Sequence, residues 1–181
     1  MSAITPAVRW RGANTRDTIG GEPVSTMTAA DLARETFLRG MRTADLARLA
    51  GAARPAAFPA GRRIIAEAEP AERFWLIREG TVALDLRSPG SGTAAVDTLG
   101  PGAALGWSWL FRPYRWRFGA TALSDVRAVE FDGRLVRTLC AVDPALGYEL
   151  TRRFTELVVD RLQIAQTRLL EASRPVPAPR P

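Results

Sequence analysis

The stretch LGPGAALGWSWLFRPYRWRFGATA, residues 99–122, decides how the rest of the chain is interpreted. Near its start lies the turn sequence Gly100-Pro101-Gly102, and residues 107–118 combine six aromatic and three arginine side chains without one acidic residue. A glycine turn that leads into a short helix presents free backbone N–H groups and the positive end of a helix dipole, and both favour an anion. Arginine adds fixed positive charge and forked donors. The stretch therefore predicts an anion-binding loop or a surface patch for a partner.

The composition is that of one globular domain. The chain has 181 residues, of which 46% are hydrophobic, and this length is enough to bury a single core. All 25 basic residues are arginine, against 19 acidic residues, which gives a net charge of +6. Because the chain is rich in alanine and has no lysine, we interpret this charge as a compositional bias. It permits a polyanionic partner but does not indicate one.

Histidine is absent, which excludes histidine-based triads, imidazole metal sites and histidine acid–base chemistry. We therefore expect no metal and no resident cofactor. The single cysteine, Cys140, has apolar neighbours and is expected to be a buried thiol in a reducing compartment. No segment resembles a signal peptide or has the length of a membrane span. These features favour a cytoplasmic protein without a membrane partner.

The N-terminal part predicts a flexible leader followed by two short helices. Residues 1–27 lack periodicity and are assigned to the leader. Thr28 and Asp31 have the spacing of a capping box, and Leu32 begins an apolar pattern of helical spacing. A second short helix is expected to follow Thr43 and to end near Gly51.

From Ala57 onward the hydrophobic pattern takes the period of two that is typical of β-strands. We expect strands that end at Phe58, begin at Ile64 and cover 73–77, 81–87, 94–99, 117–123 and 126–131. A hairpin turn is expected at Glu79-Gly80, with Asp85 on the polar face of the next strand. Many short strands at regular spacing predict a mainly β domain with flanking helices, built as a barrel or a double-sheet jelly roll.

A long helix is expected to close the domain, which spans residues 28–172. Asp143 is a suitable N-cap and Pro144 a suitable first residue, so the helix is predicted over 144–172, before a Pro-rich tail at 173–181. Because this helix is longer than a small barrel, its apolar stripe favours a homodimer. The expected interface residues are Phe154, Leu157, Val158, Leu162, Ala165 and Leu169.

The order of these elements resembles the cyclic-nucleotide-binding domain, the effector domain of catabolite-activator-type bacterial regulators, protein kinase A regulatory subunits and gated channels. The resemblance covers about residues 32–172. The residues that carry it are Phe58, Gly61 and Ile64, then Phe74-Trp75-Leu76-Ile77 with Gly80 and Val82, then Leu99-Gly100-Pro101-Gly102, Gly106, and Arg117 with Gly119-Ala120-Thr121.

The resemblance implies that residues 99–122 hold a phosphate-binding cassette. Gly106 and the following N–H groups would meet a cyclic phosphate, and Arg117, or Arg115 if the loop is aligned differently, would pair with it. Where the family has a glutamate that accepts from the ribose, this chain has Trp107, whose indole can only donate. That loss costs about 1.5–3 kcal/mol, or roughly 10- to 150-fold in affinity. The implied ligand-binding residues are Gly106, Trp107, Ser108, Trp109, Arg115, Arg117 and Phe118.

Several functions fit this pattern. The first is a non-enzymatic sensor that binds an anionic small molecule, with cyclic nucleotides bound weakly or replaced, and signals through a protein partner. The second is a degenerate scaffold in which Trp107, Trp109 and Phe111 fill the pocket as core residues. The third, a DNA-binding regulator, needs a helix-turn-helix module, and only nine residues follow Ala172. We therefore expect a stand-alone domain without sequence-specific DNA binding. An enzyme of the metal cupin type would need histidine ligands.

Overall fold

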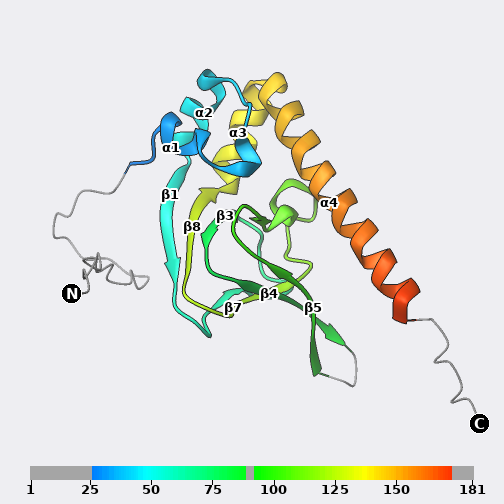
Figure 1. Ribbon diagram of the computed structural model, residues 1–181. Coiled ribbons are helices and arrows are strands. Elements are labelled where there is room, and N and C mark those ends of the chain that lie inside the picture. The colour runs from blue at the N-terminus through cyan, green and yellow to red at the C-terminus, as the bar shows by residue number, and fades with distance from the viewer. Residues whose placement is uncertain (1–25, 89–91, 173–181) are drawn as a thin grey trace, which may run out of the picture.

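The computed structural model describes residues 26–88 and 92–172. The assignments of 1–25 to a leader and of 173–181 to a tail lie outside the described residues. Two four-stranded sheets form a roll, with three helices at one end and the long helix α4 along its side (Figure 1). The elements are α1 (Ala29–Ala33), η1 (Thr36–Leu38), α2 (Thr43–Ala50), β1 (Ala53–Phe58), β2 (Arg63–Ile65), β3 (Arg73–Glu79), β4 (Val82–Ser88), β5 (Gly92–Leu99), β6 (Ala104–Leu105), η2 (Trp107–Leu110), β7 (Gly119–Ala122), β8 (Val126–Asp132), α3 (Gly133–Val142) and α4 (Pro144–Ala172).

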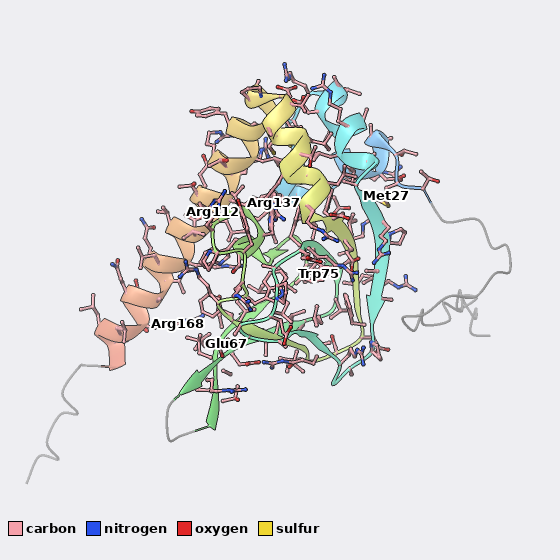
Figure 2. The ribbon with its side chains drawn as sticks, turned by 180° about the vertical axis from the view of Figure 1, so that it is seen from behind. Met27, Glu67, Trp75, Arg112, Arg137 and Arg168 are labelled. Carbon is pink, nitrogen blue, oxygen red and sulfur yellow. The ribbon has the colours of Figure 1, made fainter. Side chains whose placement is uncertain are left out.

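The predicted helix ends are confirmed where a cap defines them. The Thr28 hydroxyl accepts from the Asp31 N–H at 3.1 Å, while the Asp31 carboxylate accepts from the Thr28 N–H at 3.0 Å, so the capping box is complete. Helix α1 nevertheless ends at Ala33, and a separate 3-10 helix, η1, follows. Met27 is buried against the core, so the packed domain begins before Thr28 (Figure 2).

The two sheets are antiparallel, with strand orders β1-β8-β3-β6 and β2-β7-β4-β5. Strand β3 lies inside the first sheet, between β8 and β6, and its residues Phe74, Trp75, Leu76 and Ile77 are all buried. The apolar run from 73 to 77 is thus confirmed as a strand covered on both faces. The mainly β jelly roll with a long C-terminal helix is the fold that the sequence predicts.

Two expectations about β4 were wrong. The turn at Gly80 does not form a hairpin, because β3 and β4 belong to different sheets and Gly80 carries the chain across at a φ of 83°. A side chain there would collide with the Asp125 carbonyl. Asp85 is buried rather than exposed, since the Arg63 guanidinium covers its carboxylate with an Nη2–Oδ1 distance of 2.8 Å.

One aromatic stack joins the roll to the helices. Phe74 of β3 stacks on Phe131 of β8 at 4.5 Å between ring centroids and on Trp109 of η2 at 4.8 Å. Phe154 of α4 meets the edge of this stack, 5.4 Å from Phe74 and 5.5 Å from Trp109. Because these rings come from both the roll and α4, the first half of α4 is part of the core. Cys140 of α3 is only partly buried, in contrast to the buried thiol expected, and burial raises its pKa.

Candidate functional site

The turn at Gly106 is the point from which the candidate site is built. Strand β6 pairs with β3 through Trp75–Leu105 and Leu76–Ala104, and this pairing fixes the position of Gly106. Gly106 has a φ of 90°, and a Cβ placed on it would lie 2.9 Å from Cζ3 of Trp116. Only glycine allows both the positive φ and the close approach of the indole. The sequence-predicted glycine is therefore required by the local structure.

The residues after Gly106 separate into two environments. Ser108 is buried, and its hydroxyl accepts from the Arg117 N–H at 3.4 Å, so it ties η2 to the segment before β7. Trp109 is fully buried in the aromatic stack, and its indole N–H has no hydrogen-bond partner among the described residues. Trp109 therefore lies in the core, as the scaffold interpretation expects, and it does not face the cavity described next.

A cavity lies beside the Gly106 turn. Its free volume is about 10 Å³, which is room for about one water molecule. Drug-sized ligand sites typically occupy about 300–1,000 Å³. A cyclic nucleotide therefore needs side chains to move before it can enter. The lining residues are Ile65, Leu84, Leu105, Gly106, Trp107, Ser108, Trp116, Phe118 and Arg161.

The two arginines that the sequence singles out lie outside this lining. Arg117 is exposed, and its guanidinium carbon lies 5.8 Å from the centre of the Trp107 ring, at the cavity mouth. Arg115 donates to the Ala68 carbonyl at 2.8 Å and so supports a turn in which Ala68 adopts a φ of 68°. Arg115 therefore has a local structural contact, whereas Arg117 stays beside the ring that borders the site.

A second pair of arginines flanks the other side of the same loop. The guanidinium carbons of Arg112 and Arg137 lie 5.9 and 4.4 Å from the centre of the Tyr114 ring, and both are labelled in Figure 2. Arg137 also donates to the Trp109 carbonyl at 2.6 Å. These contacts fix the loop after η2 against α3.

Arg161 of α4 is the site residue that sequence reasoning missed. It lines the cavity, and its Nη2 donates to the Ala104 carbonyl at 2.7 Å. Burial lowers its pKa, and the negative charge of Asp97 partly opposes that change. The available signal was its position four residues after Leu157 and seven after Phe154, which places it on the face of α4 that meets the roll.

The described residues give no sign of a metal centre or a membrane span. In 26–88 and 92–172, no group of three or more His, Cys, Asp or Glu side chains could hold a metal ion. The helices within the same ranges lack the combination of length and apolar character that a bilayer crossing requires.

Comparison with known proteins identifies the fold. Residues 55–143, which contain the Gly106 turn and most of the cavity lining, match the family model of the cyclic nucleotide-binding domain. The domain belongs to this family. A CRP-like cAMP-activated global transcriptional regulator of Mycobacterium tuberculosis is 31% identical over 121 residues, which are 67% of this chain and 54% of that protein. The chain thus spans about half the length of this curated relative.

Solved structures agree with the family assignment. A candidate cyclic nucleotide-binding protein from Geobacter metallireducens is 29% identical with a TM-score of 0.68, covering 75% of this chain and 98% of that one. A cyclic nucleotide-binding domain from Methylobacillus flagellatus has a TM-score of 0.70 at 19% identity, over 83% of this chain and 89% of that one, and supports the fold alone. Gly106 belongs to residues 99–122, the segment from which the sequence predicts anion binding, and the cavity lies beside it.

Proposed function

We propose that the chain is a non-enzymatic regulatory domain that binds an anionic small molecule beside Gly106 and signals through a partner protein. The observation that carries the proposal is the combination of a cavity at the Gly106 turn with arginines at its wall and mouth and no carboxylate in its lining. A desolvated guanidinium without a carboxylate partner is stabilised when an anion enters.

Cyclic nucleotides fit this site poorly. Trp107 stands at the cavity wall where the family resemblance places a ribose acceptor, and an indole cannot accept. The cavity also lacks the volume for a nucleotide in its present shape. We therefore expect cyclic AMP to bind no tighter than the high micromolar range. A bound nucleotide would place its phosphate at the mouth, where Arg117 lies against Trp107.

The test is calorimetric titration of the parent, Trp107→Glu and Arg117→Ala with cyclic AMP and cyclic GMP. Trp107→Glu restores an acceptor and frees volume, so it should tighten binding about 10- to 150-fold. Arg117→Ala should abolish nucleotide binding and leave the melting temperature nearly unchanged, because Arg117 is exposed. Nanomolar binding by the parent would show that Trp107 does not occupy the ribose position.

The partner proposed first is a second copy of the chain. Val158, Leu162, Ala165 and Leu169 follow one another at spacings of four, three and four residues, the pattern of a coiled-coil seam. Leu162 is 56% exposed, so its side chain is available to a second helix. Phe154, also expected at this interface, is fully buried in its own chain and offers no surface to a partner. The absence of sequence-specific DNA binding stays a prediction.

A ligand-free scaffold is the second candidate. The packing of the Trp116 ring against Gly106 and the small free volume favour it, since both are what a filled pocket would show. In that case none of the three proteins in the titration would bind a nucleotide or a smaller anion, and neither substitution would change that result.

A further inference from the structure

The lining of the cavity specifies the kind of molecule it accepts. Six of its side chains are apolar or aromatic, namely Ile65, Leu84, Leu105, Trp107, Trp116 and Phe118. The Ser108 hydroxyl accepts from the Arg117 N–H, and no carboxylate or amide side chain lines the wall. A sugar would bury hydroxyl groups here with few acceptors to receive them, which is unfavourable. Flat apolar groups meet the three aromatic rings without that cost.

Among the described residues that line the cavity, only Arg161 carries a charge. It makes no ion pair within the described part of the chain, and its Nη2 donates to the Ala104 carbonyl at 2.7 Å. The guanidinium stays charged and keeps further N–H donors besides the one that binds the Ala104 carbonyl. The lowered pKa of Arg161 reflects the loss of water around this charge.

Two other arginines on the same face of α4 have carboxylate partners, unlike Arg161. Arg153 pairs with Glu149 at 2.7 Å and donates to the Phe37 carbonyl. Arg168, labelled in Figure 2, pairs with Asp97 at 3.2 Å and donates to the carbonyl of Val96 in β5. Arg153 and Arg168 hold the helix to the domain and have carboxylate partners. Arg161 lies between them on the same face and has none.

We propose that Arg161 anchors the anionic group of the ligand, and that the ligand is a compact aromatic carboxylate without a sugar. This inference rests on the proposed anion-binding function and names the ligand class of the same site. A carboxylate carries one negative charge and matches the planar fork of one guanidinium, whereas a phosphate monoester carries close to two charges at neutral pH, of which one arginine balances one. Because the cavity has room for about one water molecule, the aromatic body enters only when the half-buried side chains of Trp107 and Phe118 move apart, and it then lies against Trp116.

The test uses the full chain with benzoate, phenylacetate and indole-3-acetate as probes and the matching primary amides as neutral controls. Binding is followed by calorimetry and by tryptophan fluorescence, because Trp107 and Trp116 line the cavity. At least one carboxylate should bind the parent, and its amide should bind at least about tenfold more weakly. Arg161→Leu should weaken the carboxylate about 10- to 150-fold.

Two further variants make this result specific. Arg168→Leu removes an arginine from the same helix face outside the cavity and should leave affinity within about twofold. Arg161→Lys keeps the charge, so it should retain part of the affinity if Arg161→Leu fails to fold. Equal binding of the carboxylate by the parent, Arg161→Lys and Arg161→Leu would overturn the proposal.

The failure of this inference is distinguishable from the failure of the proposed function. If Trp107→Glu binds cyclic AMP while no aromatic carboxylate binds the parent, the ligand class is wrong and the anion-binding function stands. If neither the nucleotides nor the carboxylates bind any variant, both proposals fail and the scaffold remains.

Discussion

The two halves of α4 are attached to the domain in different ways. In the first half, Leu146, Leu150 and Phe154 are completely buried and share a core with the sheets. From Leu162 to Glu171 every side chain is exposed, and Arg161 and Arg168 make hydrogen bonds that tie this half to the roll. Figure 1 shows the helix leaving α3 and running along the roll to a free lower end.

This difference divides one helix into a half held by buried packing and a half held by surface contacts. Buried apolar packing is strong and does not depend on salt, whereas exposed ion pairs contribute little, about 0–1 kcal/mol each. The second half is therefore the part of α4 whose position a ligand or a second copy can change at low cost. It also carries the cavity arginine and the exposed apolar stripe.

The largest expected effect is a loss of stability when a residue in the buried first half of α4 is changed. Phe154→Ala removes a ring that contacts Phe37, Phe74 and Trp109. It should lower the free energy of unfolding by about 3–5 kcal/mol. The control Leu170→Ala, at a side chain that is 73% exposed, should change it by less than about 0.5 kcal/mol. Urea denaturation measures both, and similar losses would contradict the division of α4 into two halves.

The next largest expected effect is on dimerisation through the second half of α4. Leu162→Asp places a charge in the centre of the exposed stripe and should convert a dimer into a monomer, because burial of such a leucine contributes about 1.5–3 kcal/mol. Gln163→Asp adds the same charge one position off the stripe and should leave the dimer intact. Sedimentation at high micromolar concentration measures the state. A parent that is already monomeric there, unchanged by Leu162→Asp, would refute the dimer.

Features that depend on a few adjacent residues could be predicted from the sequence. The Thr28–Asp31 capping box and the Asp143-Pro144 start of α4 are local, since a cap is made by residues within one turn. The buried strand at 73–77 was predictable because its apolar run is continuous. The sequence also placed a turn at Gly106, and the structure has one there, with a φ of 90°.

Features that depend on distant contacts could not be predicted. The glycine at 80 indicates a turn, but the next strand pairs with β5 and β7 rather than with β3, and nothing near Gly80 specifies this. Periodicity places Arg161 on the inner face of α4, but only the folded roll puts a cavity opposite it. Likewise, the rotation of η2 decides that Trp109 enters the core while Trp107 borders the cavity.

The smallest expected effect is the pH dependence of the stability that Asp143 contributes at the start of α4. The pKa of Asp143 is lowered from its ordinary value of 3.8, first by the hydrogen bond from the Leu146 N–H and further by the Arg48 side chain and the Ala145 N–H. A carboxyl with a lower pKa in the folded state stabilises the protein above its unfolded pKa. That contribution is lost as the pH falls through the folded pKa.

Asp143→Asn tests this cap because asparagine still caps a helix and does not titrate. The difference in unfolding free energy between the parent and the variant should be constant from neutral pH down to about pH 5, and should shrink below about pH 4. Asp31 and Glu149 also have lowered pKa values, but they are present in both proteins and cancel in the difference. Urea denaturation of both proteins at a series of pH values gives the curve. A difference that stays the same down to about pH 2.5 would show that Asp143 titrates alike in the folded and unfolded chains, and that the start of α4 is held by the packing of Leu146 and not by the charge of its cap.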